Sequence, residues 1–248
     1  MAKKRVSLTL DENIVEKIDR EADRRDLNRS QMVENVIDYY FSQKGLDTAI
    51  VLCGDEEVKT LELYEGKPVL SHILDNLSEE GFGRVILLVG QNHVIEEEFG
   101  SEYSDLALEY IFEENTHGTA NALLEAESRI ENNFAVLNGH VIAEVDFQDM
   151  LNVHRDEDAL GTIALTAVED PSSYGVARLK GRKILGFEEK PEEGEEPSRL
   201  INAGAYIFDP DVFSRLEESS LEAAFSRFAS KSELYGYIYG GDWKDIDE

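Results

Sequence analysis

Two stretches of the chain carry residues whose types and spacing suit chemistry. In KRVSLTL, Arg5, Ser7 and Thr9 alternate with apolar residues, so a strand would present one guanidinium and two hydroxyls on the same face. That polar face has no core to pack against and can hydrogen-bond an external partner. The second stretch, Cys53 to Lys59, follows an apolar run and combines one glycine, one lysine and three acidic residues. Cys53 is the only cysteine, which excludes an intramolecular disulfide framework and a cysteine-cluster zinc site.

The first 44 residues predict one short strand followed by two helices. Asp11 is a good N-cap after the strand, and the apolar stripe of the first helix is Ile14, Val15, Ile18 and Ala22. Asn28 can cap the second helix, whose stripe is Met32, Val33, Val36, Ile37 and Tyr40. A lone strand leaves both edges unpaired, so this segment cannot close a core by itself. Two copies can, by pairing their strands and interlocking four helices.

This pattern resembles the ribbon-helix-helix family over residues 3–43. The resemblance implies a homodimer whose two-stranded ribbon enters the DNA major groove, with paired dimers, and hence a tetramer, on adjacent half-sites. The DNA-binding residues that it implies are Lys3, Lys4, Arg5, Ser7, Thr9, Asn28, Arg29 and Ser30. Arg5, Ser7 and Thr9 would face base edges, and the others would hold phosphates. The alternative is that the ribbon only dimerises the protein.

Strands and helices alternate through residues 46–248, the second expected domain. Buried strands are expected at residues 47–53, 84–90, 107–113, 133–139, 160–168 and 202–208, with a hairpin turning at 180–182. Helices are expected at residues 68–77, 93–99, 118–130 and 147–154. This alternation is typical of a doubly wound, Rossmann-like α/β sheet. Gly45 is expected to end the second helix, which places the boundary after a first domain of residues 1–44.

The order of motifs in this second part resembles the sugar-nucleotide nucleotidyltransferases. The shared segments are Gly66-Lys67-Pro68, Gly118-Thr119-Ala120, Leu137-Asn138-Gly139, Tyr174-Gly175-Val176, Glu189-Lys190-Pro191, Asn202-Ala203-Gly204 and Trp243-Lys244-Asp245. None is decisive alone, but seven in the family's order favour its fold. The resemblance implies transfer of a nucleotide to a sugar 1-phosphate with release of pyrophosphate, a reaction that depends on charge neutralisation.

The segments that carry the family's chemistry depart from its pattern. The family's glycine-rich loop, with an arginine for the triphosphate, is reduced to Gly54 followed by acidic residues. The segment between Gly54 and Gly66 is shortened, so the family's early lysine is missing, and Lys59 is a poor substitute by position. The first metal-binding aspartate is replaced by His140, while the second matches Asp245. Mg²⁺ is therefore expected only if the transferase site is active, with Asp245 a weak ligand. No residue is assigned a catalytic role.

The segments that the resemblance implies for ligand binding match the family's pattern more closely than those that carry its chemistry. The ligand-binding residues implied are Gly54, Gly118, Thr119, Lys190, Asn202 and Gly204. Gly118 and Thr119 match the loop near the nucleobase, Lys190 the sugar-phosphate lysine, and Asn202 and Gly204 the sugar pocket. The expected ligand is a nucleotide, a nucleotide sugar or a sugar phosphate. The alternative is that Lys190 is a surface lysine, the glycines form turns and Asn202 caps backbone.

Charge is distributed unevenly along the chain. The formal net charge is −29, and residues 1–44, with nine basic and nine acidic side chains, contribute none of it. An acidic excess spread over residues 45–248 is typical of proteins from extreme halophiles, the alternative being an ordinary acidic enzyme. No apolar run is long enough for a membrane helix and no signal peptide is present, so we expect a cytoplasmic protein with no membrane partner.

Three functions fit these observations. The favoured hypothesis is a sequence-specific DNA-binding transcriptional regulator, in which a catalytically impaired nucleotidyltransferase-like domain is a ligand sensor or assembly module. The second is an active sugar-1-phosphate nucleotidyltransferase with an N-terminal dimerisation or DNA-binding domain. The third is a scaffold or antitoxin-like module that binds a macromolecular partner.

Overall fold

The computed structural model describes residues 6–25, 27–42, 46–54, 57–91, 93–113, 118–192 and 194–246. The chain divides into two units, Met1–Gly45 and Leu46–Glu248. No helix in the part that the structure describes is long and apolar enough to cross a membrane.

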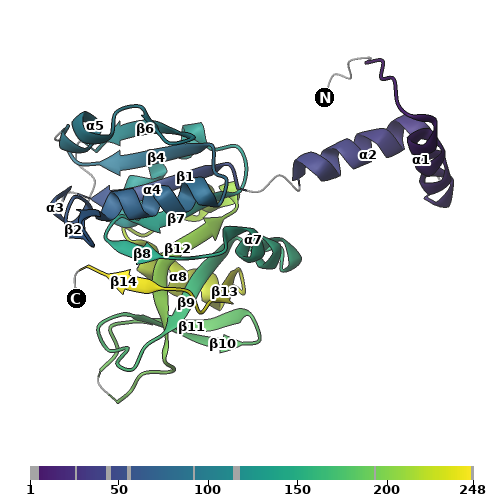
Figure 1. The fold of residues 1–248 in the computed structure, drawn as a ribbon. Helices are drawn as coiled ribbons and strands as arrows, with labels where there is room; N and C mark the ends of the chain where they lie inside the picture. The colour runs from purple at the N-terminus through teal and green to yellow at the C-terminus, as the bar shows by residue number, and fades with distance from the viewer. Residues whose placement is uncertain are drawn as a thin grey trace. The chain divides into compact units, whose positions relative to one another are not determined.

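The N-terminal unit contains the two expected helices, α1 (Glu12–Arg24) and α2 (Arg29–Ser42) (Figure 1). The Asp11 side chain caps α1 by accepting a hydrogen bond from the Asn13 amide. At α2, the Gln31 amide donates to Asn28 Oδ1 and the Asn28 amide donates to Gln31 Oε1, both at 3.0 Å, which forms a reciprocal capping box. Both predicted N-caps are therefore confirmed.

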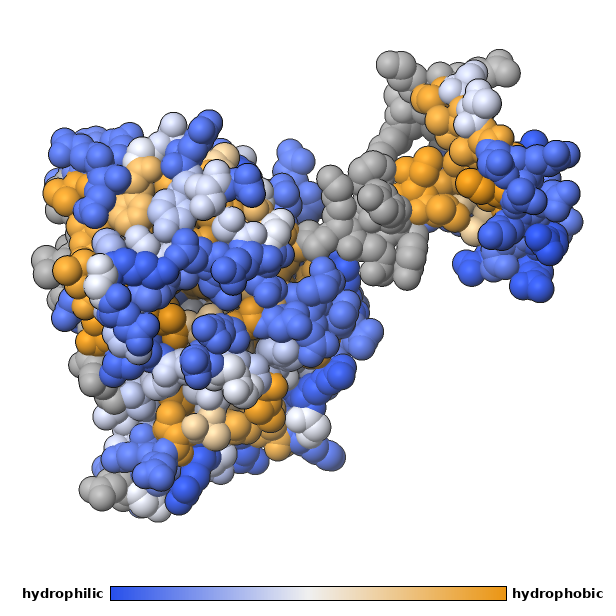
Figure 2. Space-filling model, in the orientation of Figure 1, coloured by the Kyte–Doolittle hydropathy of each residue, from blue (hydrophilic) through white to orange (hydrophobic). Residues whose placement is uncertain are grey.

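The expected strand before α1 is not formed in the single chain. Residues 6–10 have no regular structure, and Val6 and Leu8 are 70% and 59% exposed. A lone strand has no neighbour to hydrogen-bond its backbone groups, so the alternation of polar and apolar residues does not produce a β-strand within one copy. Exposed apolar side chains also occur on the helices, at Ile14, Val36 and Ile37, and Figure 2 shows hydrophobic residues gathered on this unit.

The second unit is built on a ten-stranded sheet in the order β10-β11-β13-β9-β12-β7-β1-β4-β6-β5. Its strands are β1 (Thr48–Gly54), β4 (Arg84–Val89), β5 (Glu102–Tyr103), β6 (Leu106–Phe112), β7 (Phe134–Asn138), β9 (Gly161–Ala167), β10 (Gly175–Lys180), β11 (Lys183–Glu189), β12 (Leu200–Phe208) and β13 (Leu234–Ile238). Two small sheets pair β2 (Leu63–Tyr64) with β3 (Lys67–Pro68), and β8 (Val141–Ala143) with β14 (Trp243–Asp245).

The sheet of this doubly wound α/β unit contains both parallel and antiparallel strands. Strands β7, β1, β4 and β6 are parallel, but β12 runs antiparallel to both β7 and β9. The β10–β11 hairpin forms as expected and extends one edge. Because β12 enters between β9 and β7, residues 202–204 come to lie beside the end of β7.

Helices cover both faces of this sheet. They are α3 (Glu57–Thr60), α4 (Val69–Glu79), α5 (Val94–Phe99), α6 (Thr119–Leu124), α7 (Phe147–Asp156) and α8 (Leu221–Ser230), with 3-10 turns at Glu127–Arg129 and Pro210–Arg215. Successive β1 side chains contribute to different core clusters: Val51 packs with the α4 and α7 residues, and Ile50 with the α6 and α8 residues. This explains why β1 reads as a continuous apolar run.

Candidate functional site

A cavity of about 860 Å³ opens where β1, β7, β11 and β12 end or bend. Its size is within the range of pockets that hold small-molecule ligands and cofactors. Its lining includes all six residues proposed from the sequence as ligand-binding, Gly54, Gly118, Thr119, Lys190, Asn202 and Gly204, together with Asp245. The fold therefore brings together segments that lie up to about 190 residues apart in the chain.

One wall of the cavity is the N-terminus of α6, which packs against the segment before α8. Gly118 adopts a φ of +102°, and a Cβ atom there would lie 2.3 Å from the Ser219 carbonyl oxygen. The same oxygen accepts a hydrogen bond from the Ala120 amide at 3.0 Å. Thr119 Oγ1 accepts one from the Leu221 amide at 2.9 Å. Only glycine permits this close approach, so residues 118–119 are fixed by their contact with α8.

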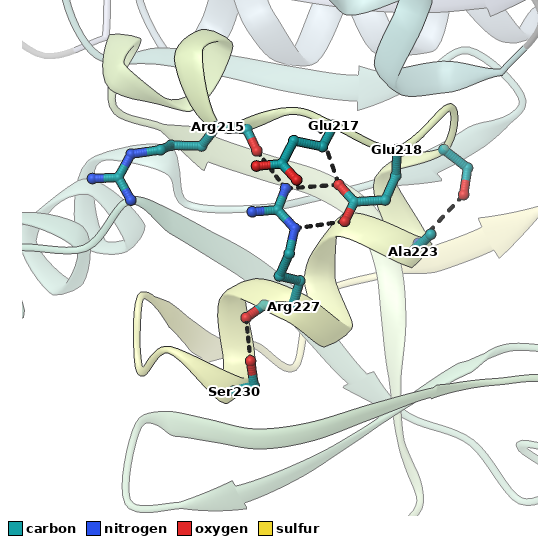
Figure 3. Close-up of polar contacts among 7 residues, drawn as sticks. Arg215, Glu217, Glu218, Ala223, Arg227 and Ser230 are labelled. Atoms are coloured by element: carbon teal, nitrogen blue, oxygen red, sulfur yellow. Dashed lines mark hydrogen bonds and ion pairs between the residues drawn. The ribbon is translucent and has the colours of Figure 1, made fainter.

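The segment before α8 is held in turn by an ion pair (Figure 3). Arg227 donates to both carboxylate oxygens of Glu218, at 2.5 and 2.7 Å, and to the carbonyl oxygen of Arg215. This bidentate contact lowers the pKa of Glu218 to about 2. Ser220 caps α8 by accepting a hydrogen bond from the Ala223 amide. The pair therefore positions the backbone on which Gly118 and Thr119 rest.

The floor of the cavity is formed by β12 and the end of β7. The Gly204 amide donates to Asn202 Oδ1 at 3.0 Å, and Asn202 Nδ2 donates to the Tyr206 hydroxyl at 2.8 Å. Burial raises the pKa of Tyr206, so its hydroxyl stays protonated. Gly204 has a φ of +74°, and a Cβ atom there would lie 3.2 Å from Val141. Asn202 is thus held in place with its amide at the cavity floor.

Lys190 follows β11 in a left-handed conformation, with a φ of +46°. Its amide donates to the Tyr174 carbonyl oxygen at 3.0 Å. Burial raises the pKa of the neighbouring Glu189, and the charge of Glu222 raises it further. Tyr174 and Trp243, both cavity residues, are in edge-to-face contact with ring centroids 5.5 Å apart. This end of the cavity therefore combines a lysine, two carboxylates and two aromatic rings.

Sequence reasoning undervalued Lys59 and missed Glu222. Lys59 lies on α3 and lines the cavity, although its position in the sequence had counted against it. The neighbouring Thr60 hydroxyl donates to the Cys53 carbonyl oxygen at 3.4 Å, which ties α3 to the end of β1. Residues 55 and 56, on which the argument for a damaged loop depended, lie outside the described residues. Glu222 follows a Ser220 N-cap, a signal that could have located the start of α8.

The residues at the family's two metal positions also lie in this cavity. His140 lies in the turn between β7 and β8, and Asp245 is opposite Val141 in the β8–β14 pair. No group of three histidine, cysteine or acidic side chains among the described residues could hold a metal ion. Mg²⁺ prefers oxygen ligands in octahedral geometry and is poorly served by an imidazole. The donor set does not fit Mg²⁺ held by protein ligands.

The residues expected to bind DNA are only partly described. Lys3, Lys4 and Arg5 lie outside the described residues. Ser7, Thr9, Asn28, Arg29 and Ser30 are all exposed. Arg29 donates two hydrogen bonds of 2.6 Å to Asp19, and this contact lowers the pKa of the Asp19 carboxyl. In a single chain its guanidinium is therefore engaged by α1.

Comparison with known proteins decides the family. Residues 51–246 match the nucleotidyl transferase model. The chain belongs to the nucleotidyl transferase family. Residues 4–44 of this nucleotidyl transferase match the ribbon-helix-helix protein, copG family. Both resemblances drawn from the sequence, and the α/β fold they imply, are confirmed.

Two relatives of this nucleotidyl transferase illustrate the similarity. The mannose-1-phosphate guanylyltransferase catalytic subunit beta of Drosophila pseudoobscura pseudoobscura is 38% identical over 200 residues, which are 77% of this chain and 53% of the relative. The bifunctional protein GlmU of Methanococcus vannielii is 33% identical over 223 residues, covering 80% and 51%. The chain spans about half the length of these curated relatives.

Solved structures share the fold of the second unit. A UDP-glucose pyrophosphorylase complexed with UDP-glucose superposes with a TM-score of 0.70 at 20% identity, covering 81% of this chain and 93% of that one. HddC from Yersinia pseudotuberculosis, complexed with GMP-PN, gives 0.69 at 22% identity, covering 81% and 94%.

The favoured hypothesis from the sequence, a transcriptional regulator with a catalytically impaired domain, is wrong. Relatives of the chain include mannose-1-phosphate guanylyltransferases, which favours the alternative of an active enzyme. The physical reason is that impairment was inferred from one loop and one metal position. In the structure, Lys59 lines the same cavity as the segments that were expected to bind a ligand without catalysing a reaction.

Proposed function

We propose that this nucleotidyl transferase joins a nucleoside triphosphate to a sugar 1-phosphate. A phosphate oxygen of the sugar 1-phosphate attacks the α-phosphorus, the bond to the β-phosphate oxygen breaks, and pyrophosphate leaves. The proposal is supported by one observation above all: a single cavity collects both lysines and the glycine, threonine and asparagine segments that such a reaction requires. The relatives' names agree with this reaction class.

Each segment then has a distinct task. Gly118 and Thr119 form the wall against which the nucleotide packs, because their contact with Ser219 and Leu221 keeps that backbone fixed. Lys190 neutralises the sugar phosphate, and Lys59 neutralises the triphosphate near the end of β1. Asn202, held by Tyr206, offers its amide to sugar hydroxyls. The residues thereby orient two anions for in-line attack.

A panel assay tests this proposal. The full chain is incubated with each nucleoside triphosphate and a set of hexose 1-phosphates, and pyrophosphate release is measured. We expect Lys190→Ala to reduce turnover about 100-fold, the usual cost of removing one charge-stabilising group. Lys180→Ala, an exposed lysine at the other end of the β10–β11 hairpin, is the matched control. Equal turnover by the two variants would show that Lys190 has no part in the reaction.

We also propose that residues 1–44 pair two copies of the chain and contact DNA as a partner, while residues 46–248 carry the transferase. Supporting this, Val6, Leu8 and Leu10 are 70%, 59% and 39% exposed, which a second copy would cover by pairing the two strands. Pairing would also place Arg5, Ser7 and Thr9 together on the outer face.

Two measurements test this second proposal. Light scattering gives the mass of the particle in solution, and titration of a DNA duplex with wild type and Arg5→Ala tests the DNA contact. A monomer in solution would contradict the pairing.

A further inference from the structure

Glu113 brings a buried carboxylate to the wall of the cavity. It is 8% exposed and is the one acidic residue that is buried in the part of the chain that the structure describes. It lines the cavity directly after β6, and its amide donates to the Val89 carbonyl oxygen at 2.9 Å, which holds it against the end of β4. Burying a carboxylate costs free energy unless hydrogen-bond donors face it. With about four lone-pair sites, this carboxylate can accept hydrogen bonds from a ligand as well as from the protein.

Strand register places Glu113 on the face of the sheet that α6 covers. Leu52 of β1 pairs with Leu88 of β4, which pairs with Ile111 of β6. These three residues pack in the core cluster that contains the α6 residues. Because side chains alternate along a strand, Glu113, two residues after Ile111, points to the same side. The carboxylate therefore shares its side of the sheet with the N-terminus of α6, the cavity wall assigned above to the nucleotide.

The order of the strands separates the two ends of the cavity. Glu113 follows β6 and Lys190 follows β11, and these two strands lie on opposite sides of β1 in the sheet. Lys59 lies on α3, which is tied to the end of β1. In a nucleotide sugar the phosphates lie between the base and the sugar. When the phosphates lie between Lys59 and Lys190, the base falls on the side of Glu113.

We propose that Glu113 recognises the base of the nucleoside triphosphate and selects guanine. An ionised carboxylate only accepts hydrogen bonds, and guanine presents two adjacent donors, N1–H and the N2 amino group, to its two oxygens. Uracil and thymine present one donor, N3–H, between two carbonyl acceptors. Adenine and cytosine present an amino group beside a ring-nitrogen acceptor. With each of these four bases, a carboxylate oxygen would face an acceptor. The inference rests on the proposed function for the presence of a nucleoside triphosphate.

Comparison of GTP with ITP measures one of these hydrogen bonds, because ITP lacks only the N2 amino group. Calorimetry of the full chain gives the dissociation constants of GTP, ITP and UTP, each with excess Mg²⁺ and without a sugar 1-phosphate, so no turnover is needed. We expect wild type to bind GTP at least about tenfold more tightly than ITP, the effect of one hydrogen bond to a charged group. The preference for GTP over UTP should be larger, because UTP places an acceptor against the carboxylate.

Glu113→Gln keeps the size of the side chain and replaces one acceptor oxygen with an amide donor. The preference for GTP over ITP should be lost, because the amide donor faces a donor of guanine. The preference for GTP over UTP should fall at least about tenfold, since a side-chain amide complements N3–H and a neighbouring carbonyl of uracil. Glu125→Gln is the matched control: Glu125 is exposed, follows α6 and is not part of the cavity lining. It should keep the ratios of wild type.

Equal affinities of wild type for GTP and ITP, or tighter binding of UTP than of GTP, would overturn the inference. A preference for GTP that persists unchanged in Glu113→Gln would also overturn it. The panel assay separates the two proposals. Turnover with UTP in preference to GTP sinks the inference alone, whereas selective GTP binding that Glu113→Gln removes, without turnover of any sugar phosphate, sinks the enzyme assignment alone. Absence of binding by every triphosphate would overturn both.

Discussion

His154 provides a test of the core beneath the transferase sheet. It lies on α7 at 2% exposure, with Nδ1 2.9 Å from the Thr162 hydroxyl of β9. Burial lowers the pKa of His154 to about 4, from 6.5, and the charge of Arg155 adds to the effect. The unfolded chain therefore binds more protons between these two values, so stability falls as pH falls from about 6.5 to 4. The shift corresponds to about 3 kcal/mol as an upper bound.

The assay is urea unfolding followed by fluorescence of Trp243, the chain's single tryptophan. His154→Gln keeps a polar side chain but cannot take up a proton. Between pH 7.5 and pH 4, we expect the unfolding free energy of wild type to fall by about 3 kcal/mol relative to that of this variant. Taking the difference cancels the titration of the acidic surface. Thr162→Val removes the hydrogen-bond partner but not the burial, so it should retain the pH slope. A difference independent of pH would refute the reasoning.

Three further predictions concern the site and the N-terminal unit. Gly118→Ala forces a Cβ atom to within 2.3 Å of the Ser219 oxygen, so nucleotide affinity should fall at least about tenfold by calorimetry, with about 1–3 kcal/mol of backbone strain. Gly181→Ala, also at positive φ but with nothing within 4 Å, should leave that affinity unchanged. Glu218→Gln weakens the pair with its arginine, and because both side chains retain some exposure we expect a loss of only about 1 kcal/mol in thermal unfolding. Its nucleotide KM should nevertheless rise, and an unchanged KM would contradict the positioning role. Val36→Asp, at a position 45% exposed in one chain, should halve the mass in light scattering while the transferase unit still unfolds at its usual urea concentration.

The central elements of the fold could be predicted because their signals are local. Strands β1 and β4 are continuous apolar runs, and α4 and α7 have clear apolar stripes within a few residues of the predicted bounds. The insertion of β12 antiparallel between β9 and β7 could not be predicted, since strand order depends on packing across the whole unit. The strand at residues 4–10 was predicted from the alternation of polar and apolar residues, but a strand needs a neighbour that one copy lacks.

The site residues that belong to shared motifs could be predicted from the sequence, whereas site residues outside these motifs were discounted or missed. Gly118, Lys190 and Asn202 stood out because each belongs to a segment shared with the family, and the fold brings them to one cavity. Lys59 was discounted because its position in the shortened segment between Gly54 and Gly66 does not match the family's early lysine, yet it lies on α3 and lines the cavity. Glu222 carries no motif and reaches the cavity only because α8 packs against α6.

Nucleotidyl transfer in the cavity can be observed directly through the phosphorus atoms of its substrates and products. The most direct measurement is phosphorus-31 NMR of purified full-length chain mixed with a nucleoside triphosphate, a hexose 1-phosphate and Mn²⁺ or Mg²⁺. We expect paired diphosphate-diester resonances of a nucleotide sugar together with pyrophosphate, which appear with wild type and Lys180→Ala and are strongly reduced with Lys190→Ala. Unchanged substrates across every nucleotide and sugar phosphate tested, or release of orthophosphate alone, would contradict it.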